Sequence, residues 1–162
     1  MQFLGTFQTL CAIKNGRNGT ENINKELLRK SKELKSKYIP IIILENNYYQ
    51  NLFNGDIGII EIDKETAYFT DGTEIKTFPL VLLPKYENAF AITIHKSQGS
   101  EYSRTAVVYP SAEKEEDGKT IFTRELLYTA ITRAKEKCLI YGSLDALKNS
   151  CKRQISRASG IK

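Results

Sequence analysis

The sequence is poor in cysteine, and its few cysteines are badly placed for cross-linking or metal binding. Cys11, Cys138 and Cys151 are odd in number and widely spaced, and no C-x-x-C pair occurs. Such a set predicts neither a disulfide framework nor a zinc site, whose cysteine ligands are closely spaced. Because free thiols persist in reducing compartments, we expect a cytoplasmic protein without a metal site of its own.

A long apolar run is also missing. The longest, Ile39–Leu44, is interrupted by Pro40 and is far shorter than the roughly 20 apolar residues of a membrane-spanning helix. The first residues lack the basic-then-apolar pattern of a secretory signal. These absences predict a soluble protein that is neither membrane-bound nor exported.

A third absence concerns nucleotide binding. The phosphate-binding pattern G-x-x-x-x-G-K-[ST] does not occur anywhere in the chain. Gly118-Lys-Thr120 is superficially similar, but it lacks the earlier glycine and follows a run of acids rather than a strand. The chain is therefore not expected to hold the phosphates of ATP by itself.

Length and charge set wide limits on what is present. With 162 residues, the chain can form one core, or one core with a small insert. Its net charge of +5 is compatible with a phosphate-rich partner and equally with an ordinary soluble surface. Charge alone therefore does not decide between these classes.

The chain begins with the pattern of an α/β unit. An apolar run, Phe7–Ile13, predicts a buried strand, and the turn-rich Asn15–Gly19 leads to a helix expected over Asn22–Lys37. The α/β pattern returns after Asn88 with the apolar run Phe90–Ile94. We therefore expect a discontinuous α/β domain made of residues 1–37 and 88–162.

Between these parts, residues 38–87 have the texture of a small β domain. Turn residues such as Asn54-Gly55 and Asp71-Gly72 separate short β-type runs, as tight hairpins require. The runs are Ile39–Glu45, Asp56–Asp63, Thr66–Thr70 and Glu74–Leu83. This pattern predicts an inserted antiparallel barrel or meander.

The last third alternates strands and helices. Thr105–Tyr109 predicts a strand, and Thr123 can cap a helix that runs to about Lys135. Leu139–Tyr141 predicts another strand, and Ser143 can cap a final helix. The α/β class therefore holds to the end of the chain.

Two short segments carry polar chemistry, and the first is Thr93–Glu101. In a strand, Thr93 and His95 would share one face while Ile92 and Ile94 point into the core. The next residues, Lys96–Ser100, provide a cation, hydroxyls, an amide and a glycine. Such groups are suited to contact with a nucleotide or a phosphodiester. Ligands also commonly bind at the carboxyl ends of α/β strands. The alternative is a polar loop without a ligand.

The second segment, Tyr128–Ala134, contains one arginine in an otherwise apolar helical pattern. At about 100° per residue, Arg133 lies at the edge of the apolar arc. Its planar, permanently charged guanidinium suits a phosphoryl group across a domain boundary. A structural salt bridge with Glu125 or Glu136 is the alternative.

The order and spacing of the two segments resemble motifs V and VI of superfamily 1 helicases. The local sequence is most similar to the RecD family, which provides the alpha subunit of exodeoxyribonuclease V. The UvrD-like branch differs before Gly99, and the Upf1-like RNA helicases usually have an acid where His95 stands. The matching stretches are Leu10–Gly19 with Ile23-Asn24, Phe53–Gly58, Thr93–Glu101 and Thr123–Arg133.

The resemblance implies a RecA-like second motor domain that lacks its own phosphate loop and carries an SH3-like insert. ATP and magnesium would be held mainly by a preceding RecA-like motor domain. Arg133 would act as the arginine finger on the γ-phosphate. Glu101 would bind the ribose, and Gln98 and Gly99 would line the cleft between the two domains.

The same resemblance implies contacts with single-stranded DNA. Thr93, His95, Lys96 and Ser97 would face the strand, and Lys14 would make a further backbone contact. The chain would then be the C-terminal part of an ATP-dependent DNA helicase of recombination and repair, inactive alone, with helicase–nuclease subunits as partners in some members. The alternatives are a stand-alone nucleic-acid-binding module and an Upf1-like RNA helicase fragment.

Overall fold

The computed structural model describes residues 6–70, 73–109 and 123–153. Its first layer is a four-stranded, fully parallel sheet with the order β7-β1-β8-β9. The strands are β1 (Phe7–Cys11), β7 (Ala91–Thr93), β8 (Tyr102–Val108) and β9 (Ala134–Tyr141). The predicted α/β class is thus confirmed, whereas the expected Asp71-Gly72 turn and Gly118-Lys-Thr120 lie outside the described residues.

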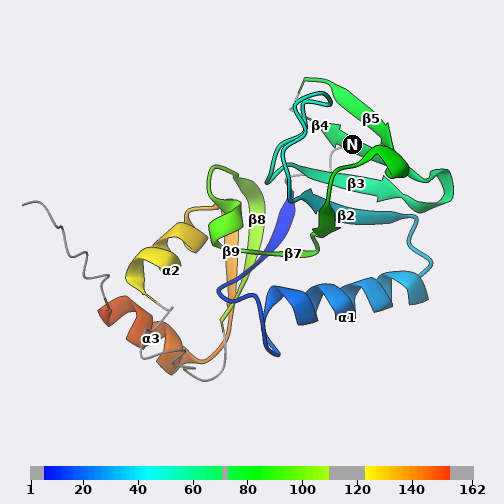
Figure 1. Cartoon of the computed structure of the whole chain (residues 1–162). Coiled ribbons are helices and arrows are strands. Elements are labelled where there is room, and N and C mark those ends of the chain that lie inside the picture. The colour runs from blue at the N-terminus through cyan, green and yellow to red at the C-terminus, as the bar shows by residue number, and fades with distance from the viewer. Residues whose placement is uncertain (1–5, 71–72, 110–122, 154–162) are drawn as a thin grey trace, which may run out of the picture.

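Helices cover both faces of this sheet (Figure 1). The first, α1 (Thr20–Glu33), lies on one side, and α2 (Arg124–Ile131) and α3 (Leu144–Lys152) lie on the other. Helices α2 and α3 begin where the sequence predicts caps: Thr123 Oγ1 accepts the Leu126 amide, and Ser143 Oγ accepts the amides of Asp145 and Ala146. Within the described residues, no helix is long and apolar enough to cross a membrane.

The second layer is a five-stranded antiparallel sheet, β5-β4-β3-β2-β6, at the upper right of Figure 1. Its strands are β2 (Tyr38–Ile43), β3 (Ile57–Glu61), β4 (Thr66–Thr70), β5 (Ile75–Pro79) and β6 (Tyr86–Asn88), with short 3-10 turns at Ile62–Lys64 and Leu80–Leu82. An antiparallel meander was one of the two predicted forms. No pairing closes β5 onto β6 in the described part of the chain, so the SH3-like barrel stays a prediction.

Strand β2 joins the two layers because both of its faces are buried. Ile42 packs in the core of the parallel sheet with Leu10 and Ile92, whereas Ile41 and Ile43 pack in the core of the antiparallel sheet. Successive side chains of a strand point to opposite faces, so an uninterrupted isoleucine run can serve both cores. The insert is therefore packed against the α/β part through β2.

Two helix boundaries differ from expectation. Helix α1 ends at Glu33 rather than Lys37, and Lys35 adopts a positive φ of 50° that terminates it. Helix α2 ends at Ile131 rather than near Lys135, because Ala134 already pairs with Tyr102 as the first residue of β9. Arg133 consequently lies in the turn between helix and strand, not on the helix.

Candidate functional site

The segment after β7 runs from the carboxyl ends of the parallel strands, here called the carboxyl edge, to their amino ends, the amino edge. Thr93 pairs with Cys11 at the carboxyl end of β1, whereas Arg104 pairs with Phe7 at its amino end. At about 3.3 Å per residue these two levels are about 13 Å apart. Residues 94–101 connect them, so the predicted site residues fall into two groups at opposite edges. The expected position at the carboxyl end of a strand holds for Thr93, whereas the segment Thr93–Glu101 ends near the amino edge, where β8 begins.

The carboxyl-edge group begins with a tight turn. Strand β7 ends at Thr93, Ile94 takes the helical conformation, and His95–Ser97 form a 3-10 turn. The turn is held by Thr93 Oγ1, which accepts the Lys96 amide at 3.3 Å. His95 is exposed on this turn and is not part of the strand, so the predicted strand alternation does not extend to it.

Ser97 has a different position from the one expected. Its side chain is fully buried, and its hydroxyl donates to the Ile94 carbonyl at 2.7 Å. A hydroxyl enclosed in this way supports the turn from inside and is not accessible to a nucleic acid. The expectation that Ser97 faces DNA is therefore corrected.

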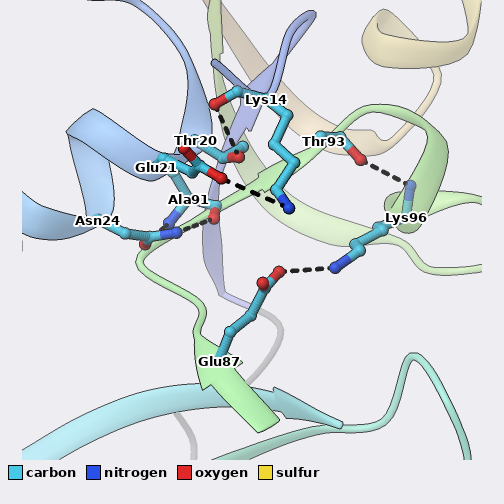
Figure 2. Close-up of polar contacts among 8 residues, drawn as sticks. All are labelled: Lys14, Thr20, Glu21, Asn24, Glu87, Ala91, Thr93 and Lys96. Atoms are coloured by element: carbon cyan, nitrogen blue, oxygen red, sulfur yellow. Dashed lines mark hydrogen bonds and ion pairs between the residues drawn. The ribbon is translucent and has the colours of Figure 1, made fainter. Parts of the chain in front are cut away.

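Two lysines meet at the carboxyl edge (Figure 2). Lys96 follows β7 and Lys14 follows β1, the neighbouring parallel strand. Each ammonium has a carboxylate partner: Lys96 Nζ lies 2.6 Å from Glu87 Oε1, and Lys14 Nζ lies 3.4 Å from Glu21 Oε1. Adjacent strands thus bring together two cations that are 82 positions apart in the sequence.

The backbone beneath this edge is braced by α1. Asn24 uses both ends of its amide, donating to the Ala91 carbonyl at 2.8 Å and accepting the Ala91 amide at 2.9 Å. The loop before α1 is also tightly packed, because a Cβ on Gly19 would collide with the Lys14 carbonyl oxygen. The positions of Lys14 and β7 are therefore set by close backbone contacts.

The amino-edge group is built around Arg133. Its Nε donates to the Thr129 carbonyl at 3.2 Å, Nη1 donates to the Ser100 carbonyl at 3.0 Å, and Nη2 donates to Thr132 Oγ1 at 3.4 Å. The guanidinium thus uses carbonyl and hydroxyl acceptors instead of the carboxylate of Glu125 or Glu136. Ser100 belongs to the loop from β7, so Arg133 is in direct contact with that loop.

Neighbouring residues strengthen this contact. The Tyr102 amide donates to the Arg133 carbonyl at 2.8 Å, and the Tyr102 ring is buried below it. Burial raises the pKa of the Tyr102 hydroxyl, while the Arg133 charge acts in the opposite direction. The exposed Glu101 carboxylate lies 3.2 Å from Lys135 Nζ at the start of β9.

Gly99 shapes the loop between the two groups. Its φ of +86° is in the left-handed region, and no described atom lies within 4 Å of a Cβ built there. Glycine is therefore required by the backbone conformation and not by crowding. Gln98 and Gly99 are both exposed, which leaves this bend open to a ligand.

Sequence reasoning missed Glu87 and Glu21, the carboxylates that pair with the two lysines. Glu21 follows Lys14 by seven residues and lies in the first turn of α1, a position that the helix prediction could have indicated. Glu87 lies on β6 of the antiparallel sheet, and no local pattern links it to Lys96. Among the described residues, no group of three or more His, Cys, Asp or Glu side chains could hold a metal ion.

Comparisons with known proteins identify the family of the chain. Residues 88–141 match the UvrD-like helicase C-terminal domain. The chain is 35% identical to the RecBCD enzyme subunit RecD of Haemophilus influenzae over 94% of its length, and 26% identical to the ATP-dependent RecD2 DNA helicase of Deinococcus radiodurans over 93%. It spans about a quarter of these relatives, 24% and 22% respectively.

A solved structure shares the fold. The Pif1 helicase from Bacteroides, crystallised with ADP-AlF3 and single-stranded DNA, aligns with a TM-score of 0.52 over 85% of this chain and 41% of that chain, at 18% sequence identity. The fold, the domain match and the relatives agree with one another. The chain belongs to the RecD family of superfamily 1 helicases, in the part that corresponds to the UvrD-like C-terminal domain.

Proposed function

We propose that this chain supplies the second half of an ATP site and part of the single-stranded DNA path of an ATP-dependent DNA helicase that acts in recombination and repair. The observation that carries the proposal is the hydrogen bond from Arg133 to Ser100. It joins the helicase arginine motif to the Gln98–Glu101 loop. Two relatives, a RecBCD enzyme subunit and an ATP-dependent DNA helicase, support the same proposal.

In this proposal Arg133 is the arginine finger. A guanidinium carries five N–H donors, and the three described bonds leave donors for a phosphoryl oxygen. Those bonds also fix the orientation of the guanidinium before nucleotide arrives, which favours electrostatic stabilisation of the transition state. Arginine fingers contribute about 10³–10⁵ in rate.

Glu101, Gln98 and Gly99 complete the nucleotide side. Glu101 would accept hydrogen bonds from the ribose, and the exposed bend at Gln98-Gly99 would border the nucleotide. The phosphates and magnesium would be held by a preceding RecA-like motor domain. The lack of a phosphate loop in the sequence supports that division.

Thr93, His95, Lys96 and Lys14 form the proposed DNA side. Lysine ammonium groups and hydroxyls are typical partners of phosphate oxygens and contribute no base specificity. Ser97 would support the turn from within. Other subunits of a helicase–nuclease complex are proposed as partners from the family resemblance.

The loop between the two edges suggests how the two ligands communicate. Residues 94–101 run from the DNA side to the nucleotide side, and Arg133 is bonded to the far end of the loop. A shift of Arg133 on closure around ATP would move Ser100 and, through the chain, the turn that carries Lys96. Both ligands would thereby bias one element, as linkage between two sites requires.

The proposal is tested by replacing Arg133 with alanine in the protein that joins this chain to a phosphate-loop domain. DNA-stimulated ATP hydrolysis should fall by about 10³-fold or more, while affinity for oligothymidylate changes less than about twofold. Arg104→Ala, which removes an exposed arginine of β8, is the charge-matched control and should leave turnover unchanged. Retained turnover in Arg133→Ala would refute the finger role, and stronger stimulation by RNA than by DNA would favour an RNA helicase.

A further inference from the structure

Glu87 occupies an unusual position for a carboxylate. It lies in β6 directly opposite Ile42 of β2. Residues directly opposite in antiparallel strands present their side chains on the same face. Ile42 packs in the core of the parallel sheet, so Glu87 is on the face of the antiparallel sheet that is turned toward that core and toward Lys96, as Figure 2 shows.

The Glu87–Lys96 pair is closer and more enclosed than two other lysine–glutamate pairs, Lys14–Glu21 and Lys85–Glu45. Its atoms are 2.6 Å apart, and the two side chains are 34% and 37% exposed. The Lys14–Glu21 pair is 3.4 Å apart with side chains 61% and 60% exposed, and the Lys85–Glu45 pair is 4.0 Å apart and similarly open. Coulomb attraction is screened less in an enclosed pair, so Glu87 holds Lys96 more firmly than Glu21 holds Lys14.

This pairing bears directly on anion binding. A phosphate that approaches the Lys96 ammonium meets the Glu87 carboxylate, and the two anions repel each other at contact distance. The Lys14 ammonium points into the same region in Figure 2. An incoming phosphate would therefore find two cations, each paired with a carboxylate: Lys96 with Glu87 and Lys14 with Glu21.

We propose that Glu87 is an internal competitor for the nucleic-acid phosphate at Lys96, one that the bound strand displaces. The ion pair joins β6 of the antiparallel sheet to the turn after β7. When a phosphate replaces Glu87 as the partner of Lys96, this contact between the two sheets is broken. DNA binding is thereby linked to the contact between the sheets. The inference rests on the proposed contact between Lys96 and DNA, and it adds a residue that limits affinity.

The test measures the Kd of fluorescein-labelled oligothymidylate for the full-length protein that contains this chain, at several salt concentrations. Glu87→Gln retains the shape of the side chain and removes the charge, and it should tighten binding about two- to fivefold, the range expected for a partly exposed ion pair. Glu45→Gln makes the same change in net charge on an exposed residue of the antiparallel part and should change affinity much less. Thermal unfolding confirms that each variant is folded.

Lys96→Gln separates the possible outcomes. It should weaken binding, and adding Glu87→Gln in its background should give no further gain, since the two residues act through one contact. Equal tightening by Glu45→Gln, weaker binding by Glu87→Gln, or a gain that persists without Lys96 would overturn the inference. If Lys96→Gln itself has no effect, the proposed DNA contact fails as well; if it weakens binding while Glu87→Gln does not tighten it, only the role of Glu87 fails.

Discussion

The two sheets of this protein differ in what they offer a ligand. The parallel sheet carries Lys14 and Lys96 at one edge and Arg133 at the other, each held by specific polar contacts. The antiparallel sheet instead encloses an apolar core and exposes aromatic side chains on the loop after β2, where Tyr48 is 74% and Tyr49 103% exposed. The candidate chemistry is thus concentrated in one layer, and the other layer contributes the carboxylate of Glu87.

The difference also shows what connects the layers. They share β2, whose Ile42 lies in one core while Ile41 and Ile43 lie in the other. They also share the ion pair between Glu87 and Lys96. A change in the antiparallel sheet can therefore affect the carboxyl edge of the parallel sheet through the apolar packing of β2 and through the Glu87–Lys96 ion pair.

The largest effect on stability is expected from breaking the apolar connection. Ile42→Ala removes a fully buried side chain and should lower the free energy of unfolding by about 2–5 kcal/mol. Ile75→Ala, at a 55% exposed position of the same sheet, should cost less than about 0.5 kcal/mol. Chemical denaturation measures both. Equal, small losses would show that the two layers are not joined through β2.

Two glycines in similar backbone conformations allow an effect on ATP hydrolysis to be distinguished from an effect on stability. Gly99 in the parallel part and Gly55 in the antiparallel part have φ values of +86° and +102°, and no described atom crowds a Cβ at either position. Alanine should cost about 1 kcal/mol of stability at each site, since both backbones are left-handed. DNA-stimulated ATP hydrolysis should fall in Gly99→Ala and stay unchanged in Gly55→Ala. The same loss of turnover in both variants would contradict a special role for the Gln98–Glu101 loop.

The smallest expected effect is a pH dependence from the core of the parallel sheet. Burial raises the pKa of the Cys11 thiol from 9.0 to about 12. Above about pH 9 the unfolded chain releases a proton that the folded chain keeps, so stability falls as pH rises toward 12. Between pH 8 and 9.5 this loss should be less than about 1 kcal/mol. Cys11→Ala should remove it, and an unchanged pH slope in that variant would show that other groups are responsible.

Much of the fold follows from local patterns in the sequence. The predicted strands over Thr66–Thr70 and near Thr105–Tyr109, and the caps at Thr123 and Ser143, appear in the structure because alternation and capping act within a few residues. The predicted strand over Ile39–Glu45 corresponds to β2 in the structure. Its division between two cores depends on the packing of distant segments.

The candidate site was less accessible from sequence. The strand was expected to continue to His95, but it ends at Thr93 because Ile94 turns into a 3-10 turn that buries Ser97. Arg133 was placed on a helix, although the pairing of Ala134 with Tyr102 draws the chain into β9. The turn after β7 is held by bonds between residues three positions apart, which strand alternation does not describe. The start of β9 and the Glu87–Lys96 pair depend instead on partners distant in sequence, which local periodicity cannot identify.

In the proposed function, one loop joins a nucleotide side at Arg133 to a DNA side at Lys96. The most direct test measures, in one protein that includes a phosphate-loop domain, both kcat for ATP hydrolysis and Kd for oligothymidylate in the Arg133→Ala and Lys96→Gln variants. The account predicts that Arg133→Ala abolishes kcat and keeps Kd, while Lys96→Gln raises Kd and keeps kcat at saturating DNA. If both variants change the same quantity, or neither changes either, the two sides are not where this account places them.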